Sequence, residues 1–267
     1  MENITSYLSV ALGAALDAGR AILSVYNAPD ADWEVERKAD NSPLTRADRE
    51  AHTLIARRLA EQTPFPLLSE EGSHAPYAER STWTTLWVVD PLDGTKEFLK
   101  RNGEFTVNIA LIDGGRPVGG VIYVPVTDTL YFGAEGLGAY KTANASAVES
   151  VMWDTMSEAG QQLPLSAKRE DYVVVVSRSH LSPETEAFIE KARREHAHVS
   201  TLSSGTMVTT ASRPSRIYDT IIKILSLLVT FFIAYQIPSC PIFLATKLEP
   251  STITSATTDL NTLTAVE

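Results

Sequence analysis

Hydrophobic residues recur at helical spacing in the first part of the chain. Between residues 3 and 26 the apolar side chains follow a three- and four-residue repeat, which predicts an amphipathic helix. A second helix is predicted from Thr45 to about Gln62, and Pro64 and Pro66 terminate it. The N-terminal segment lacks the basic residues that open a signal peptide. We therefore expect it to form a core helix, in a cytoplasmic protein.

The middle of the chain alternates short apolar runs with turn signals, a pattern typical of β-strands. Strands are predicted at Leu67–Ser69, Leu86–Asp90, Phe105–Ile112, Pro117–Val124, Asp128–Ala134, Tyr172–Ser177 and Val199–Ser203. The three between residues 105 and 134 predict an antiparallel meander. Because Pro91 cannot donate a ladder hydrogen bond, the strand before it is expected to end at Asp90. Residues 141–170 are expected to form a loop-rich insertion, and Pro183 a helix start.

The composition of the chain changes after residue 205. All 14 glycines lie in residues 1–205, whereas 206–267 contain none and hold four basic and four acidic residues. The formal net charge of −10 therefore resides in the first region. A compact α/β domain needs turns, and turns usually need glycine. We therefore treat 1–205 as one region and 206–267 as an atypical tail.

Charge and cysteine content exclude several classes of protein. The net charge of −10 and the lack of a basic tract argue against nucleic-acid binding. The single cysteine, Cys240, excludes a disulfide framework and a cysteine-based zinc site. The apolar run at residues 224–235 is shorter than the roughly 20 residues of a spanning helix. Association with the inner face of the cell membrane stays an alternative that we do not favour.

Carboxylates gather at the predicted carboxyl ends of two strands. These residues are Glu70, Glu71, Asp90 and Asp93. Converging carboxylates repel one another, and no basic partner is obvious, so a divalent cation with oxygen ligands is expected. Gly94 allows close backbone approach to a ligand, and Thr95 begins a predicted helix whose N-terminus can receive phosphate. Magnesium-assisted cleavage of a phosphate ester is the chemistry this pattern favours.

Asp48 has two readings that both stay open. The spacing Thr45-x-x-Asp48 is that of a helix capping box, which needs no ligand. Beside the carboxylate set, Asp48 can also belong to the site.

The motifs together resemble those of the inositol monophosphatase superfamily. The resemblance covers roughly residues 3–206 and rests on Leu68-Ser-Glu-Glu71, Trp87-Val-Val-Asp-Pro-Leu-Asp-Gly-Thr-Lys-Glu-Phe98, Asp40-Asn-Ser-Pro-Leu-Thr-Arg-Ala-Asp48 and Val176-Ser-Arg-Ser-His180. The Lys-Glu-Phe after Gly-Thr is similar to the 3′(2′),5′-bisphosphate nucleotidase branch. This resemblance implies an α/β fold, a layered α-β-α-β-α sandwich of the sugar-phosphatase type.

The resemblance also implies a role for each residue of the site. The implied metal ligands are Glu70, Asp90, the Leu92 carbonyl and Asp93, with Mg²⁺ as the cofactor. Asp48 and Thr95 are implied to orient the attacking water. Gly94, Thr95, Gly205 and Thr206 are implied to bind the substrate.

The implied activity is removal of the 3′-phosphate of adenosine 3′,5′-bisphosphate, which gives AMP and phosphate and clears a by-product of sulfate assimilation. An inositol monophosphatase or another sugar phosphatase of the same fold is the close alternative, and an inactive truncated pseudoenzyme is the other. The expected partner is a small nucleotide bisphosphate, with a homodimer left open.

The chain departs from the family pattern after Gly205. The family's W-D-x-A-A-G element, whose aspartate completes a second metal site, has no match there, and Trp153-Asp154 resembles it only by coincidence. Our hypothesis is that residues 206–267 are not the family's own C-terminal lobe. A frameshift, a gene fusion or an assembly error would explain this.

Overall fold

The structure is a computed structural model that describes residues 3–29, 33–38, 43–72, 75–163, 172–177, 183–195 and 198–204. Its helices are α1 (Ile4–Tyr26), α2 (Arg46–Gln62), α3 (Tyr77–Arg80), α4 (Thr95–Leu99), α5 (Trp153–Ala159) and α6 (Pro183–Glu195). Its strands are β1 (Glu36–Arg37), β2 (Pro43–Leu44), β3 (Leu67–Ser69), β4 (Thr85–Asp93), β5 (Thr106–Asp113), β6 (Arg116–Val124), β7 (Thr129–Ala134), β8 (Gly138–Ala143), β9 (Gln161–Leu163), β10 (Tyr172–Ser177) and β11 (Val199–Ser204).

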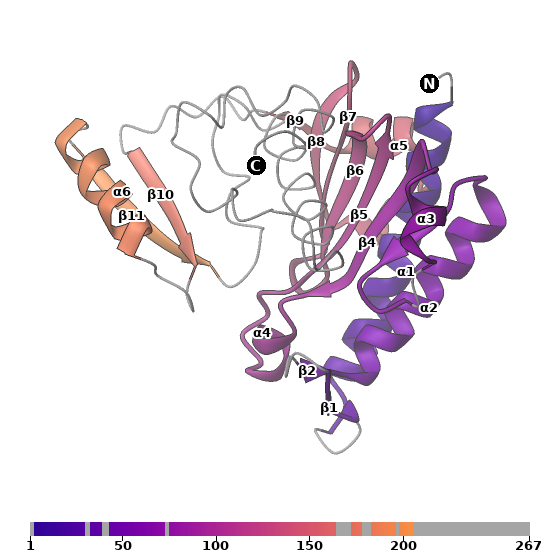
Figure 1. Cartoon of the computed structure of the whole chain (residues 1–267), viewed down its shortest axis with the longest axis horizontal. Coiled ribbons are helices and arrows are strands. Elements are labelled where there is room, and N and C mark those ends of the chain that lie inside the picture. Colours follow the sequence, from indigo (N-terminus) through magenta and orange to yellow (C-terminus); the bar gives the residue numbers. More distant parts are fainter. Residues whose placement is uncertain are drawn as a thin grey trace.

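A seven-stranded mixed sheet organises the larger part of the described residues. Its strand order is β3-β4-β5-β6-β7-β8-β9, with β3 parallel to β4 and every later neighbour antiparallel. The predicted meander of β5, β6 and β7 is confirmed. Helices α1 and α2 lie side by side on one face of this sheet (Figure 1). The mixed sheet with helices is the α/β class that the sequence predicts.

The main core lies between the sheet and helix α1. Leu8, Leu12 and Ile22 of α1 are fully buried. At Gly19 a β-carbon would lie 2.2 Å from the ring of Tyr123, so glycine is what lets the helix approach β6 this closely. By length and composition α1 is the one described helix that could cross a membrane, but 67% of its most apolar stretch is buried within the protein. It is a core helix, as the sequence predicts.

Two sequence predictions about β-structure are wrong. Strand β4 does not stop at Asp90 but runs through Pro91 to Asp93, because a bulge in the ladder removes the need for a proline N–H there. The predicted loop-rich insertion also contains the last residues of β8, and all of α5 and β9. Trp153 of α5 is 5% exposed and packs edge-on against Phe132, so this segment belongs to the core.

Strands β10 and β11 form a separate parallel pair, with helix α6 between them in the sequence. The predicted strands at 172–177 and 199–203 and the helix start at Pro183 are confirmed. The tail at 206–267, its apolar run at 224–235, and Gly205 and Thr206 lie outside the described residues.

Candidate active site

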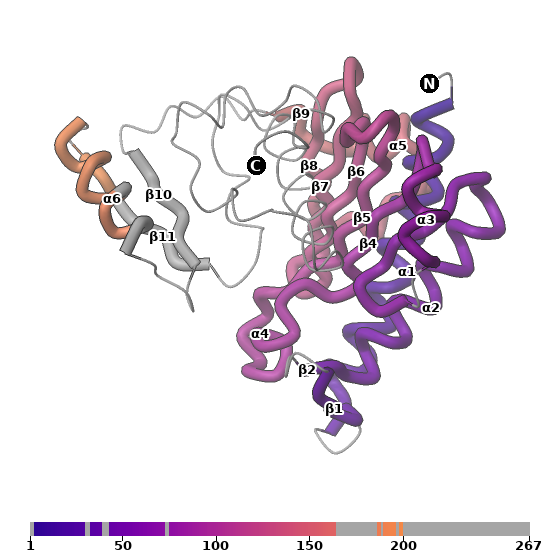
Figure 2. The backbone as a smooth tube through the Cα atoms, viewed as in Figure 1, coloured from indigo at the N-terminus to yellow at the C-terminus, as the bar shows by residue number. Residues whose placement is uncertain are grey.

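Helix α4 follows β4 directly, at one end of the seven-stranded sheet. The separate two-stranded sheet of β1 and β2 lies near the same end (Figure 2). The first turn of α2 lies at this end as well, immediately after β2. Residues predicted from three separate sequence segments therefore meet here. They are Asp48 at the start of α2, Glu70 after β3, and Asp90, Leu92, Asp93 and Thr95 along β4 and α4.

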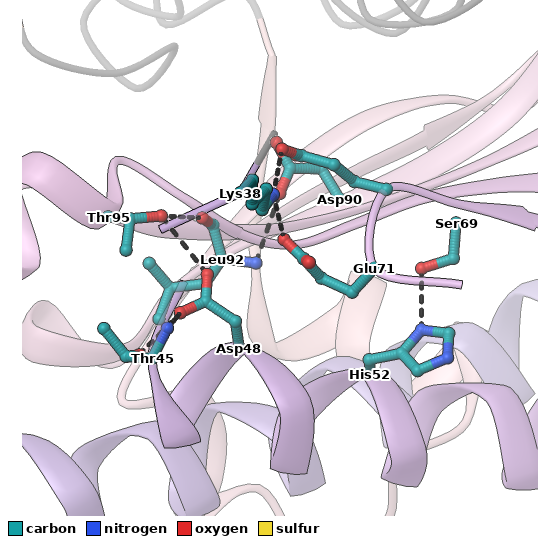
Figure 3. A network of polar contacts seen from close by, with 10 residues as sticks. Lys38, Thr45, Asp48, His52, Ser69, Glu71, Asp90, Leu92 and Thr95 are labelled. Carbon is teal, nitrogen blue, oxygen red and sulfur yellow. Dashed lines mark hydrogen bonds and ion pairs between the residues drawn. The ribbon is translucent and has the colours of Figure 1, made fainter. Parts of the chain in front are cut away.

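Lys38 is the basic partner that the sequence did not suggest. Its ammonium group lies 2.8 Å from Oε1 of Glu70 and 2.5 Å from Oε1 of Glu71 (Figure 3). Burial disfavours the charged lysine, but the hydrogen bonds and charges of the two glutamates outweigh it and raise the Lys38 pKa. The expectation of a cluster without a basic partner is thus wrong, because a loop 32 residues upstream of Glu70 returns to it.

Asp90 is a buried carboxylate that is affected by the charges of other carboxylates. Its Oδ1 accepts a hydrogen bond from the backbone N–H of Leu92 at 3.2 Å. Burial raises the pKa of Asp90 well above its usual range, and the charges of Glu70, Asp93, Asp48 and Glu71 raise it further. An ionised Asp90 therefore needs a nearby cation to be stable.

The bulge in β4 decides where Asp93 points. Asp90 is paired with Asn108 on β5, and Asp93 with Thr106, so three steps along β4 match two along β5. In a regular strand, residues three apart point to opposite faces. The extra residue brings Asp93 back to the face of Asp90, because Asn108 and Thr106 are two apart and share a face.

Asn108 and Thr106 are site neighbours that the sequence reasoning missed. Asn108 is 1% exposed, and its Nδ2 lies 3.5 Å from Oδ2 of Asp93. Asn108 Oδ1 and Thr106 Oγ1 are buried without a hydrogen-bond partner in the described protein. A signal was present, because these are the polar side chains of an otherwise apolar run, Thr106-Val-Asn-Ile-Ala-Leu111.

Asp48 makes the predicted capping contacts and also contacts Thr95. Its Oδ2 accepts hydrogen bonds from the backbone N–H of Thr45 at 2.8 Å and from the Thr45 hydroxyl at 2.5 Å. The first of these is one half of the capping box, and in the other half the Thr45 side chain accepts a hydrogen bond from the backbone N–H of Asp48. Its Oδ1 lies 3.2 Å from Oγ1 of Thr95. Burial raises the Asp48 pKa, although the Thr45 hydrogen bonds oppose this. The cap leaves one carboxylate oxygen to face the site (Figure 3).

The backbone at Gly94 needs glycine. With φ of 95° and ψ of 39°, it occupies the left-handed region immediately before α4. A β-carbon would strain the chain here. This turn places Oγ1 of Thr95 3.3 Å from the carbonyl oxygen of Leu92, as well as near Asp48. Gly94 thus fixes the position of the Thr95 hydroxyl.

The donor set suits a small, hard cation. In the part of the chain that the structure describes, no three Asp, Glu, His or Cys side chains are close enough to hold one ion as they stand. Glu70 and Glu71 are directed to Lys38 instead. The donors around Asp90 are nonetheless carboxylate and carbonyl oxygens, which Mg²⁺ prefers. The unpartnered Asn108 Oδ1 marks room for a further polar group beside them. The residues fit Mg²⁺.

Known proteins share both the sequence and the fold. Residues 3–218 match the Inositol monophosphatase family. The Escherichia coli K12 protein named 3′(2′),5′-bisphosphate nucleotidase CysQ is 41% identical over 205 residues, which cover 76% of each chain.

Two solved structures extend this likeness. The crystal structure of CysQ from Bacteroides thetaiotaomicron, described as a bacterial member of the inositol monophosphatase family, is 49% identical. Its TM-score is 0.72, and the match covers 81% of this chain and 79% of that one. The extragenic suppressor protein SuhB of Bartonella henselae is 29% identical with a TM-score of 0.58, over 78% of this chain and 74% of its own. The chain belongs to the inositol monophosphatase family.

Proposed function

We propose that the protein is a Mg²⁺-dependent 3′(2′),5′-bisphosphate nucleotidase that removes the 3′-phosphate of adenosine 3′,5′-bisphosphate, giving AMP and phosphate. The observation that carries this proposal is the contact between Thr95 and Asp48 beside the buried carboxylate of Asp90. The names of the relatives in Escherichia coli and Bacteroides thetaiotaomicron support the choice of substrate.

The proposed ligands of Mg²⁺ are three acidic side chains and one backbone carbonyl oxygen. They are Glu70, Asp90, the carbonyl oxygen of Leu92, and Asp93. When bound, Mg²⁺ neutralises charge on the transferred phosphoryl group and makes a water molecule more acidic. The burial of Asp90 strengthens its interaction with a cation, because the surrounding protein screens charge less than water does.

Thr95 and Asp48 are the proposed residues that handle the attacking water. A threonine hydroxyl donates one hydrogen bond and can accept others. When Thr95 donates to Oδ1 of Asp48, its oxygen lone pairs can accept a hydrogen bond from water and orient it toward phosphorus. The raised pKa of Asp48 makes it a stronger base than an ordinary aspartate, so it can take the proton that Thr95 passes on.

Gly94 and Thr95 are also proposed to bind the phosphate, through backbone N–H groups at the start of α4. Gly205 and Thr206 are proposed to contact the substrate as well. Residues 1–205 form the proposed phosphatase region, and 206–267 an atypical tail.

The proposal is tested by phosphate release from adenosine 3′,5′-bisphosphate with Mg²⁺ present. We expect turnover that EDTA abolishes and that exceeds turnover of inositol 1-phosphate. Faster hydrolysis of the inositol phosphate would favour the sugar-phosphatase alternative.

A second protein, in which a W-D-x-A-A-G-containing lobe replaces residues 206–267, tests the role of the tail. Activity in that protein alone would confine the proposed function to the form with the family lobe. Inactivity of both proteins toward every substrate would refute the nucleotidase proposal.

We propose a cytoplasmic location, which fits the buried position of α1 within the protein. Cell fractionation tests it, and recovery of the protein with membranes would support attachment instead.

A further inference from the structure

The side chains on one face of strand β5 change from apolar to polar where the strand reaches the candidate active site. Val107, Ile109 and Leu111 are buried in the main core, on the face toward α1. On the alternate positions, Ala110 and Ile112 lie in a second apolar cluster. The same face becomes polar at the start of the strand, at Thr106 and Asn108, which lie beside β4 residues of the proposed metal site.

Asn108 touches the site at two points. It is the cross-strand partner of Asp90, so the two side chains lie next to each other on one face. Its Nδ2 is directed to Oδ2 of Asp93 at 3.5 Å. An amide N–H can donate to a carboxylate, so Asn108 favours the rotamer of Asp93 that lies beside Asp90.

The other half of the amide has no partner within the described protein. Asn108 is 1% exposed, yet its Oδ1 receives no hydrogen bond. Thr106, fully buried and opposite Asp93, has an equally unpartnered hydroxyl. Buried polar atoms are nearly always paired, so two such atoms beside the same carboxylates indicate a polar occupant.

We propose that Asn108 is a positioning residue of the metal site. Its Nδ2 orients Asp93 toward the ion, and its Oδ1 accepts a hydrogen bond from a water molecule in the site. This inference rests on the proposed Mg²⁺-dependent function. Residues that orient metal ligands in this way typically contribute about 10- to 100-fold to metal affinity.

The test replaces the amide by an apolar group of similar size, Asn108→Leu, and measures Mg²⁺ binding by calorimetry. We expect the dissociation constant to rise about tenfold or more, while the melting temperature in EDTA stays at or above that of the wild type. Saturating Mg²⁺ should restore most of kcat, because the variant binds the ion less tightly but keeps Thr95 and Asp48.

Thr142→Val is the matched control. Thr142 is fully buried on β8 and donates to the carbonyl oxygen of Met156 at 2.9 Å, in a part of the sheet outside the proposed site. Its loss should lower the melting temperature without changing Mg²⁺ affinity. Equal Mg²⁺ affinity in the wild type and the Asn108→Leu variant overturns the inference. A wild type that binds no Mg²⁺ overturns the proposed function itself.

A measurement on the wild type covers the case in which Asn108→Leu fails to fold. With ¹⁵N-asparagine labelling, the Asn108 side-chain NH₂ signal should shift over the Mg²⁺ range that calorimetry gives. A signal that stays in place while calorimetry reports binding contradicts a role for this amide.

Discussion

The ammonium group of Lys38 lies 2.8 Å from Oε1 of Glu70, although 32 residues separate them in the chain. The same ammonium contacts Glu71, whose side chain is 8% exposed, while that of Glu70 is 39% exposed. One lysine thus compensates two glutamates at the edge of a site whose central carboxylate, Asp90, is buried. The charge balance of these glutamates therefore depends on the Lys38 side chain as well as on any bound ion.

Replacing Lys38 by methionine should therefore make the protein more dependent on Mg²⁺. Glu70 and Glu71 would then lack their cation, and the free energy of unfolding in EDTA should fall by about 1 kcal/mol, since the pair is partly exposed. Thermal melting with EDTA and with Mg²⁺ measures this, and the stabilisation by Mg²⁺ should be larger than in the wild type. An unchanged response to Mg²⁺ would contradict the prediction. Arg116→Met, which breaks an exposed pair with Glu135, is the control.

Asp90→Asn should separate stability from activity. Burial raises the folded-state pKa of Asp90, so the folded protein holds this proton more tightly than the unfolded chain. Stability from this group is present at low pH and is lost as pH rises through the folded pKa. In EDTA at pH 8 the free energy of unfolding of the variant should exceed that of the wild type by on the order of 1–3 kcal/mol. This difference should shrink toward pH 4. Urea melts at several pH values check this, and a variant less stable at pH 8 would disprove it. Phosphatase activity should disappear.

Thr95 should contribute through its hydroxyl and not through its shape. Thr95→Val keeps the branched side chain but cannot contact Asp48 or the carbonyl of Leu92, and kcat should fall about 100-fold or more. Thr95→Ser keeps the hydroxyl and should stay within about tenfold of the wild type. Steady-state kinetics at saturating Mg²⁺ distinguishes the two. Similar losses in both variants would mean that packing, not the hydroxyl, is required.

Gly94→Ala should affect both stability and activity. The left-handed backbone at φ 95° makes a β-carbon cost about 1–2 kcal/mol and should move Thr95. Gly114→Ala is the matched control, because Gly114 has a φ of +55° and open space around it in the turn between β5 and β6. We expect similar melting temperatures in the two variants but loss of activity only in Gly94→Ala. Normal activity in Gly94→Ala would argue against a fixed turn before α4.

Sequence patterns located the elements that depend on local interactions. The three- and four-residue repeat of α1, the capping box of α2 and the meander of β5, β6 and β7 are confirmed, because side-chain period and turn residues act over a few positions. The candidate residues Asp48 and Thr95 were also identified from motifs, and the structure brings them together.

Tertiary structure decided what depends on distant pairing. The bulge that turns Asp93 to the face of Asp90 is set by the pairing of β4 with β5. The strand end predicted from Pro91 was therefore wrong. Lys38 could not be assigned to Glu70 from spacing, and Asn108 became a neighbour of both aspartates only through strand register. Local sequence fixes which residues are acidic, but only the folded chain fixes which positive and polar groups lie beside them, because charges interact through space and not along the chain.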